Sequence, residues 1–332
     1  MASQVLALIL SFAALGVSCS SRTSVPSGCL TVKVSGASSG EYSSLGAAIN
    51  ALGTGSSSST ACIFMYPGIY EEQVVINAFK GTLTLYGYTT DTSSYANNKV
   101  TMHHSENATV AGSDEASSTV DARGNNFRMY NIDVVNSFGV GSQAIAFTSN
   151  GNQQSFYGCG FYGYQDTLYV HSGYQYYKKC LIQGAADYIF GDATAWFEQC
   201  TAPTQSITSV KSTAGGAITA MHRSTTSETT WCVINNSTIE AAPGYTVTGG
   251  VYLGRPWGVD ARVIYQYCSL SNIINSKGWA TMAPSAVPTF MEYSNRGAGA
   301  TTTSRMYETT ATAAVSLSEI FTSGTGWIDN TY

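Results

Sequence analysis

The sequence predicts an all-β fold, a right-handed single-stranded parallel β-helix with a short N-terminal helix that caps one end. Three observations support this prediction. Strand-like segments rich in Val, Ile, Tyr and Phe recur between clusters of Gly, Asn and Ser. Long helical periodicity occurs only near residues 42–52. In the middle of the chain, a short motif repeats at the length of one solenoid coil.

The first 20 residues have the properties of a secretory signal peptide. Residues 5–17 form an apolar run that is followed by small residues, and this run is too short to cross a bilayer as a helix. No later stretch approaches ~18 consecutive apolar residues. We therefore expect residues 1–20 to be removed and residues 21–332 to form one domain. The protein should be secreted, extracellular, monomeric and free of the membrane.

The composition limits the classes of function. Of 332 residues, 44% are hydrophobic and 11% are charged, so the chain can bury a large core. About a quarter of the residues in a soluble protein are usually charged, and here Ser, Thr, Gly, Asn and 22 Tyr take their place. The net charge of −5 and the lack of Lys or Arg runs argue against nucleic-acid binding. Such a surface suits carbohydrate better.

A cysteine motif gives the length of one coil. The pattern aromatic-x-x-Cys occurs at residues 156–159, 177–180 and 197–200, and again at 265–268. The first three cysteines are 21 and then 20 residues apart, a spacing typical of one turn of a parallel β-solenoid. Equivalent positions in successive coils should therefore stack at about 4.8 Å, the spacing between neighbouring strands.

Two aspartates occupy the same position in this repeat. Asp166 follows Cys159 by seven residues, and Asp187 follows Cys180 by seven residues. We therefore expect the two carboxyl groups to be stacked neighbours. Like charges that close repel, which should raise the pKa of one carboxyl and leave the other ionised. The pair would then supply an acid and a nucleophile or base.

Two glutamines and an arginine extend this candidate site. Gln143 precedes Gln165 by 22 residues, about one coil, so two amides should join the carboxylates. For the glutamines alone, a structural ladder of stacked amides is the favoured interpretation. Arg255, held between Gly254 and Pro256, is the candidate cation that keeps one carboxylate ionised. An arginine that closes a surface turn is the alternative.

Five motifs, in this order, make the chain resemble the pectin methylesterase family. They are GIYEE at 68–72, QAIAF at 143–147, QDTL at 165–168, GAADYIFG at 184–191 and LGRPW at 253–257. The similarity extends from about residue 30 to about residue 284. Tyr188 replaces the more usual Phe, and Ile145 and Phe147 stand where plant members more often have Val and Leu. The chain is most similar to the short secreted form without a pro-domain, and we expect a fungal origin.

The resemblance implies a reaction and its residues. The methyl esters of galacturonate in pectin would be hydrolysed to pectate and methanol, without a metal or another cofactor. Asp187 would be the nucleophile, kept ionised by Arg255. Asp166 would donate a proton to the leaving methoxide and then act as base towards water. Gln143 and Gln165 would stabilise the oxyanion.

The resemblance also implies the residues that bind pectin. Gln143 and Arg255 would contact it, and three aromatic residues look like walls for galacturonate rings, namely Trp257, Phe190 and Trp279. Core packing is the alternative for each of the three rings. Tyr70 and Glu72, in the first motif, we expect to be mainly structural.

Removal of the signal peptide would leave seven cysteines, so at least one thiol must stay unpaired. The resemblance implies a disulfide between Cys180 and Cys200. Cys159, in the same column, would then be a buried free thiol. Cys29 with Cys62 is a plausible second bridge.

Two further features concern covalent modification. A third disulfide, between Cys232 and Cys268, is left open by the sequence. The sequons at Asn107, Asn235 and Asn236 predict N-glycosylation.

Three other functions compete with a carboxylate esterase. Ser38 lies in a G-x-S-x-G pattern between a strand-like segment and the helical segment, as in serine esterases. Two acids on a β-helix would also suit a glycoside hydrolase or a lyase acting on the same polymer, and a lyase would commonly need calcium. A solenoid that binds the cell wall without catalysis is the third alternative.

Overall fold

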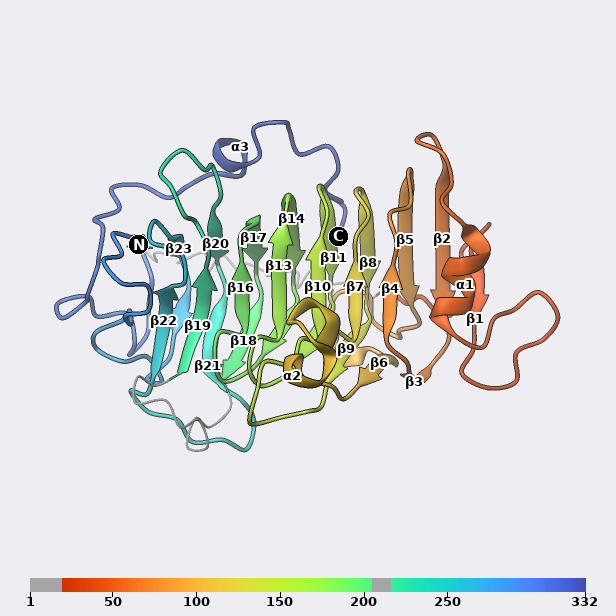
Figure 1. Cartoon of the computed structure of the whole chain (residues 1–332), viewed down its shortest axis with the longest axis horizontal. Coiled ribbons are helices and arrows are strands. Elements are labelled where there is room, and N and C mark those ends of the chain that lie inside the picture. The colour runs from red at the N-terminus through yellow and green to blue at the C-terminus, as the bar shows by residue number, and fades with distance from the viewer. Residues whose placement is uncertain (1–19, 205–215) are drawn as a thin grey trace, which may run out of the picture.

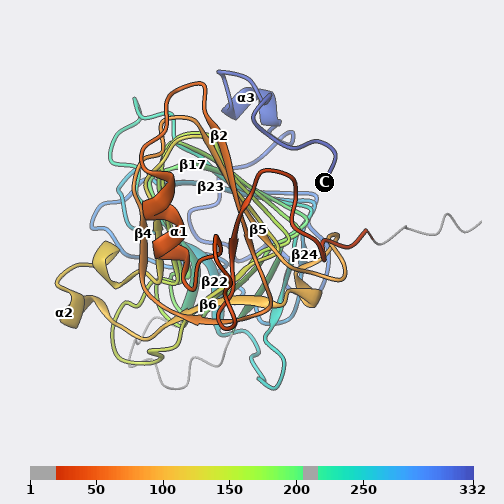
Figure 2. The same cartoon turned by 90° about the vertical axis from the view of Figure 1, so that its right-hand side faces the viewer.

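The computed structural model describes residues 20–204 and 216–332, and these form a parallel β-helix. The coils follow one another along the long axis of the molecule (Figure 1), and they lie one behind another in the perpendicular view of Figure 2. Successive coils add strands to three sheets in which, among these described residues, all paired strands are parallel. The predicted fold class is confirmed.

Within each sheet, neighbouring strands come from successive coils. The ten-stranded sheet contains β1 (Leu30–Val32), β2 (Thr60–Met65), β5 (Thr82–Gly87), β8 (Phe127–Tyr130), β11 (Gln154–Tyr157), β14 (Tyr174–Lys178), β17 (Thr194–Glu198), β20 (Cys232–Asn235), β23 (Arg262–Gln266) and β25 (Thr289–Tyr293). The seven-stranded sheet contains β4 (Val74–Ile76), β7 (Val120–Ala122), β10 (Phe147–Asn150), β13 (Leu168–Ser172), β16 (Ile189–Gly191), β19 (Gly216–Met221) and β22 (Val251–Pro256). The eight-stranded sheet contains β3 (Gly68–Glu71), β6 (Val100–His104), β9 (Asp133–Asn136), β12 (Gly160–Tyr162), β15 (Leu181–Gln183), β18 (Thr201–Thr204), β21 (Thr238–Ala241) and β24 (Ser269–Leu270).

The aromatic residues of the cysteine motif stack in the core at the predicted spacing. Phe156 pairs with Tyr177 across β11 and β14, and Tyr177 pairs with Phe197 across β14 and β17. Their ring centroids are 4.6 Å apart in both pairs, and the planes differ by 9°. Because this separation equals the distance between neighbouring strands, the repeat of 20 to 21 residues is the coil itself.

One helix, α1 (Leu45–Leu52), packs against β1, β2 and β4 at the N-terminal end of the solenoid (Figure 2). The Ser44 hydroxyl caps its first turn. The Glu72 carboxylate accepts the N–H groups of Leu45 at 2.7 Å and Gly46 at 3.1 Å, so a negative charge lies at the helix N-terminus, where it is favourable. The predicted N-terminal helix and the structural role of Glu72 are confirmed.

Tyr70 is structural as well. Its side chain is buried, and its hydroxyl donates to the carbonyl oxygens of Val32 and Tyr66 at 3.1 and 2.9 Å. These hydrogen bonds connect β3 to β1 and to the corner that follows β2. The motif at residues 68–72 therefore stabilises the end of the solenoid.

The segment after β25 crosses the outer face of the ten-stranded sheet. It contains α3 (Leu317–Ile320), and its apolar side chains join an outer cluster with Tyr157 and Trp196 of the sheet, namely Ile320, Phe321, Trp327 and Ile328. The remaining short helices are α2 (Ala108–Ala111) and the 3-10 turns η1 (Tyr95–Asn97) and η2 (Glu115–Ser117).

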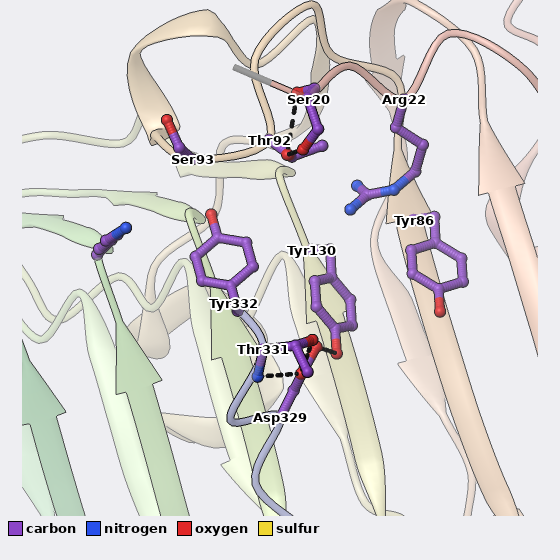
Figure 3. A pocket seen from close by; sticks show the side chains of 10 residues that line it. Ser20, Arg22, Tyr86, Thr92, Ser93, Tyr130, Asp329, Thr331 and Tyr332 are labelled. Atoms are coloured by element: carbon purple, nitrogen blue, oxygen red, sulfur yellow. Dashed lines mark hydrogen bonds between the residues drawn. The ribbon is translucent and has the colours of Figure 1, made fainter. Parts of the chain in front are cut away.

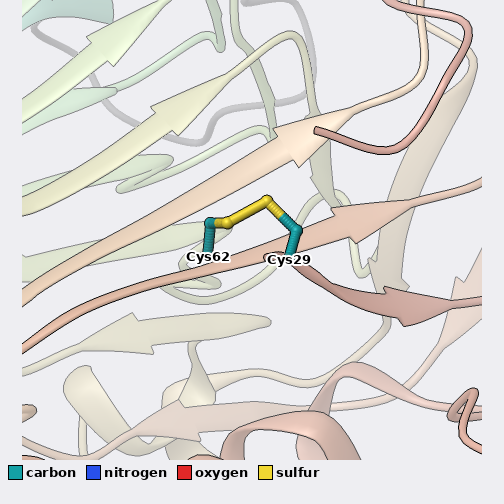
Figure 4. The surroundings of a disulfide bond; sticks show 2 residues. All are labelled: Cys29 and Cys62. Atoms are coloured by element: carbon teal, nitrogen blue, oxygen red, sulfur yellow. A yellow bond between two sulfur atoms is a disulfide. The ribbon is translucent and has the colours of Figure 1, made fainter. Parts of the chain in front are cut away.

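The cysteines that flank the start of the solenoid form a disulfide. Cys29 directly precedes β1 and Cys62 lies in β2, and their neighbours Leu30 and Ile63 are paired across the two strands. The Cα atoms are 4.6 Å apart, within the range of disulfides, and Figure 4 shows the bond. This pairing, plausible from the sequence, is confirmed.

The expected disulfide between Cys180 and Cys200 is wrong, because both are buried free thiols. They do stack in one column with Cys159, which is the predicted free thiol. Each sulfur atom instead lies 3.4 to 3.5 Å from a carbonyl oxygen of the preceding coil, and the acceptors are Met129, Phe156 and Tyr177. The three thiols therefore lie beside one another in the column, and no bond joins their sulfur atoms.

The pairing of Cys232 with Cys268 does not form either, since both are buried free thiols. Cys232 lies in β20, where its partners in the neighbouring strands are Ala195 and Val263. Cys268 lies at the corner before β24, so the two cysteines belong to different columns.

Neither described range contains a helix long and apolar enough to span a bilayer. The predicted signal peptide, residues 1–20, falls outside the described residues except for its last position. The assignment of residues 21–332 to one domain stays a prediction.

Candidate active site

Asp166 and Asp187 lie at equivalent corners of adjacent coils, before β13 and β16 of the seven-stranded sheet. The residues that precede them, Gln165 and Ala186, are paired, and the Asp166 N–H donates to the Ala186 carbonyl at 3.0 Å. Both aspartates have left-handed backbone conformations, with φ of 62° and 49°, which Asp tolerates better than most residues. Their relative exposures are 7% and 5%. The stacking predicted from the sequence is present.

A cavity of about 150 Å³ gathers nearly all predicted site residues. Its walls consist of Asp114, Gln143, Gln165, Asp166, Asp187, Phe190, Ala220, Arg255, Trp257 and Met282. They come from the corners and strands of the seven-stranded sheet and from the loops beside it. Residues spread over 169 positions of sequence thus meet at one place because successive coils stack.

Arg255 holds Asp187 with two parallel hydrogen bonds. Nε donates to Oδ1 at 2.8 Å, and Nη2 donates to Oδ2. Arg255 lies in β22, where it pairs with Ala220 of β19, one coil beyond β16. Burial acts to lower the pKa of the guanidinium, but the hydrogen bond and charge of Asp187 act to raise it, and its pKa is raised. A bidentate pair of this kind fixes the orientation of the carboxylate and places a positive charge against it.

Asp166 has a different environment. Burial raises its pKa well above the usual range, and the charges of Asp187 and Asp114 raise it further, while Arg255 acts in the opposite direction. Asp166 is therefore the carboxyl that can retain a proton, next to a carboxylate that an arginine holds. The two carboxyl groups therefore have the different surroundings that the sequence predicts, and their roles as acid and nucleophile stay a prediction.

The two predicted amides also line the cavity. Ala144, which follows Gln143, donates its N–H to the Gln165 carbonyl at 3.1 Å, so the two glutamines lie on adjacent coils. The Ser142 hydroxyl donates to Oε1 of Gln143 at 3.2 Å. This bond occupies the acceptor end of the amide and leaves its N–H₂ group as a donor for a ligand.

Two of the three predicted aromatic walls are present. Trp257 is 37% exposed and borders the cavity. Phe190 lies behind it, with ring centroids 6.1 Å apart, and is stacked on Tyr169 at 4.4 Å. Phe190 is only 3% exposed, so it supports the wall more than it offers a surface.

Trp279 is not a wall of this cavity, and that prediction is wrong. Its relative exposure is 0%, and its ring stacks on Phe290 at 4.2 Å and contacts Tyr265 edge to face. It pairs with Gly254 at the inner side of β22, where the missing side chain of glycine leaves room for the indole. Core packing, the alternative from the sequence, accounts for this residue.

Asp114 and Met282 line the cavity without having been predicted. Asp114 lies in the excursion between β6 and β7, and Met282 lies in the loop after β24. Such loops have no coil period, so sequence spacing gives no register for their residues. The only signal in the sequence was the acidic character of Asp114.

The three predicted glycosylation sites have different surroundings. Asn107 caps α2 through Oδ1, which accepts the Val110 N–H at 3.1 Å, and the residue is 8% exposed. The Asn235 side chain donates to Glu198 at 2.7 Å. Asn236 is exposed at a corner of the solenoid. All three stay predictions, and Asn236 is the most accessible of them.

Two alternatives from the sequence concern other groups. Ser38 lies in an exposed loop and is not among the residues that line the cavity. Within residues 20–204 and 216–332, no group of three or more His, Cys, Asp or Glu side chains could hold a metal ion.

Comparison with known proteins identifies relatives over almost the whole chain. The model of the Pectinesterase family matches residues 31–325. The probable pectinesterase A of Neosartorya fischeri is 52% identical over 314 residues, which cover 94% of this chain and 92% of that protein.

Two solved structures have the same fold. The pectin methylesterase from Aspergillus niger has a TM-score of 0.87 and 51% identity, and the match covers 94% of this chain and 100% of that one. The pectin methylesterase from carrot has a TM-score of 0.76 and 27% identity, and the match covers 87% of this chain and 90% of that one. The most similar of these relatives are fungal, as the resemblance led us to expect.

Proposed function

The chain belongs to the pectinesterase family, and we propose that it cleaves the methyl esters of galacturonate in pectin with Asp187 as nucleophile and Asp166 as acid and base. The protein is a carboxylic ester hydrolase, and its products are pectate and methanol. One observation carries the assignment of roles: of two carboxyl groups stacked in one cavity, only Asp187 is paired with Arg255, while burial and neighbouring charge raise the pKa of Asp166.

The first half of the reaction forms a covalent intermediate. A carboxylate oxygen of Asp187 bonds to the ester carbonyl carbon, and the π electrons move to the carbonyl oxygen. The amides of Gln143 and Gln165 donate to this oxyanion, a contribution worth about 3 kcal/mol for one donor. As the intermediate collapses, the bond to the methoxy oxygen breaks and Asp166 gives that oxygen its proton. Methanol leaves, and an anhydride joins the sugar carboxyl to Asp187.

The second half regenerates the enzyme. The Asp166 carboxylate takes a proton from water, and the water oxygen bonds to the sugar carbonyl carbon. The bond to Asp187 breaks, and its carboxylate returns to Arg255. The galacturonic acid product then loses its proton to solvent, and Asp166 is again protonated.

The binding of pectin is proposed from the same cavity. Gln143, Arg255 and Trp257 would contact the sugar, with Phe190 behind the indole ring. Trp257 is the wall with exposed surface, so a galacturonate ring packing on it would bury apolar area on both sides.

The competing functions have less support from the described residues. A serine esterase needs its serine beside the substrate pocket, and Ser38 lies apart from the cavity. A glycoside hydrolase also needs two carboxyl groups, but the family that the chain belongs to consists of pectinesterases, which are ester hydrolases. Product analysis separates these chemistries, since an esterase releases methanol without new reducing or unsaturated ends.

One experiment tests the proposal and the non-catalytic alternative together. Methanol release from highly methylated pectin is measured for the unaltered protein, Asp166→Asn and Asp187→Asn, with folding checked by circular dichroism. We expect both variants to fold, to bind pectin and to lose methanol release. Full activity in a folded Asp187→Asn variant would refute the role of this carboxylate. Loss in Ser38→Ala, with folding retained, would support a serine esterase.

The setting of the reaction is proposed from the sequence. We propose a secreted, extracellular monomer that acts on pectin in the cell wall, binds no nucleic acid and needs no cofactor. The apolar N-terminal run and the low density of basic residues support this proposal. Full activity after treatment with a chelator would agree with it.

A further inference from the structure

A second cleft, of about 440 Å³, lies away from the catalytic cavity and shares no residue with it. It opens at the outer side of the ten-stranded sheet, where β5 and β8 carry Tyr86 and Tyr130 (Figure 3). The N-terminal segment, the loop before η1, the corner after β14 and the C-terminal residues complete its walls. These residues are Arg22, Thr92, Ser93, Lys179, Asp329, Thr331 and Tyr332, together with Ser20, the last residue of the predicted signal peptide. We call it the tyrosine cleft.

Two cations in the tyrosine cleft lack an acidic partner. The Arg22 guanidinium lies 4.8 Å from the Tyr86 ring centroid, and Nη1 donates to the Gly87 carbonyl and to Asn131 Oδ1 at 3.3 and 3.1 Å. Lys179 Nζ lies 5.7 Å from the Tyr332 ring centroid. In the described part of the chain, neither side chain takes part in a salt bridge.

The one carboxylate in the tyrosine cleft is already occupied by neutral donors. Asp329 accepts the Tyr130 hydroxyl at 2.9 Å, and it accepts the backbone N–H and hydroxyl of Thr331 at 2.9 and 2.6 Å. It therefore neutralises neither cation directly. Asp329 is the one acidic side chain among the described residues that line the tyrosine cleft, so Arg22 and Lys179 stay available to an anionic ligand.

These groups match the chemistry of an acidic sugar. An arginine offers a planar fork of N–H donors to a carboxylate, and a lysine adds a mobile positive charge. Tyrosine rings present apolar surface with a polar hydroxyl at one end, which suits the mixed faces of a pyranose. The hydroxyls of Thr92, Ser93 and Thr331 donate their protons within the protein, and their oxygens can accept hydrogen bonds from sugar hydroxyls.

We propose that the tyrosine cleft binds an acidic oligosaccharide, with one uronic acid carboxylate at Arg22 and another at Lys179. The inference rests on the proposed function, because removal of methyl groups produces such polyanionic chains. In the catalytic cavity Arg255 is paired with Asp187, and Asp114 adds a negative charge that disfavours the charged product. The tyrosine cleft would hold a demethylated stretch while the catalytic cavity takes a neutral, methylated one.

Calorimetric titration of the protein with unmethylated tetragalacturonate tests the proposal. Lys179→Gln should weaken binding at least about fivefold, because it removes one charge-assisted contact. This variant should fold, since Gln199 occupies the equivalent corner of the next coil with φ of 53°, the same as Lys179. Lys178→Gln is the matched control, because Lys178 does not line the tyrosine cleft. Arg22→Gln should weaken binding as well.

The titration can also overturn the proposal, and competition with sulfate and an assay of methanol release complete the test. Equal affinity of the unaltered protein and Lys179→Gln, or equal weakening by Lys178→Gln, overturns the proposal. Inorganic sulfate that competes as well as the tetrasaccharide would show a simple anion site and would also overturn it. Methanol release from a short methylated oligosaccharide should be unchanged in Lys179→Gln. If the unaltered protein releases no methanol, the proposed function fails. The titration then still shows whether the tyrosine cleft binds the acidic oligosaccharide.

Discussion

Asp166 and Asp187 share a backbone conformation and a position in the coil, but their contacts differ. Asp187 is held by both ends of the Arg255 fork, whereas Asp166 is buried beside it with a raised pKa. The stacking followed from the sequence because the coil length was visible in the cysteine motif. The partner of Asp187 did not follow from spacing, since Arg255 lies 68 residues further along the chain, and only the motif around it singled it out.

Asp114 should help to keep Asp166 protonated. With Asp166 in the proposed role of acid, activity should fall as the pH rises through the raised pKa of this carboxyl. Asp114→Asn removes a neighbouring negative charge, lowers the pKa of Asp166 and should move the high-pH limb of kcat to lower pH. A kcat profile against pH measures this shift. Glu115→Gln is the control, because Glu115 pairs with Arg123. An unmoved limb in Asp114→Asn would contradict the prediction.

Trp257 and Trp279 should respond to truncation in opposite ways. Trp257→Ala removes an exposed wall, so we expect KM to rise roughly fivefold, about 1 kcal/mol, with kcat and stability nearly unchanged. Trp279→Ala opens the core beside Phe290 and should lower the free energy of unfolding by about 3–5 kcal/mol. Urea denaturation and steady-state kinetics measure both effects. A stable Trp279→Ala variant with a raised KM would restore its predicted role in binding.

The sequence does not show whether the side chains of Trp257 and Trp279 face the cavity or the core. Trp257 directly follows β22, in LGRPW, and Trp279 follows a turn, in KGW. Successive side chains along a strand point to opposite faces of the sheet. This alternation does not predict the direction of a side chain just outside a strand. Resemblance placed Trp257 correctly, and only the packing against Gly254 places Trp279.

The coil repeat predicted which cysteines stack in neighbouring coils, but it did not predict the orientation of their side chains. The cysteine column is present, yet each thiol lies near a carbonyl oxygen of the preceding coil. A disulfide needs two sulfur atoms that face each other, and residue spacing contains no information on side-chain rotation. At Cys29, which lies outside the regular coils, the same register does give a disulfide.

Thiol titration should distinguish these two arrangements. The denatured, unreduced protein without its signal peptide should expose five reactive thiols, namely Cys159, Cys180, Cys200, Cys232 and Cys268. Full reduction should raise the number to seven by opening the bridge between Cys29 and Cys62. Three thiols before reduction would show a second disulfide and would favour the pairing that the family resemblance implied.

The C-terminal segment, after β25, packs across several coils of the solenoid, whereas each coil otherwise contacts mainly its two neighbours. Solenoids are stabilised mainly by nearest-neighbour contacts, but Phe321 and Trp327 belong to a cluster that includes residues of several strands, from Tyr130 in β8 to Ile264 in β23. This arrangement was not predicted, because the segment has no repeat and its partners form the outer face of a sheet, where polar residues are expected.

Loss of the packing between the C-terminal segment and the ten-stranded sheet should destabilise the entire fold. Trp327 is 8% exposed and packs edge to face on Phe321, with ring centroids 5.2 Å apart. Trp327→Ala should lower the free energy of unfolding by about 3 kcal/mol, measured by urea denaturation, while the native protein remains active. Val287→Ala is the control, because Val287 is 77% exposed. Equal stabilities of the two variants would show that the segment contributes nothing to the fold.

The division of roles between the two aspartates is tested most directly with an activated ester. In a trifluoroethyl ester of an oligogalacturonate, the leaving group departs without needing a proton from Asp166. Asp166→Asn should therefore release a rapid burst of one equivalent of trifluoroethanol per enzyme and then stall, because no base activates water to break the anhydride. Asp187→Asn should release none. A burst from Asp187→Asn, or no burst from a folded Asp166→Asn variant, would contradict the assignment of Asp187 as nucleophile and Asp166 as acid and base.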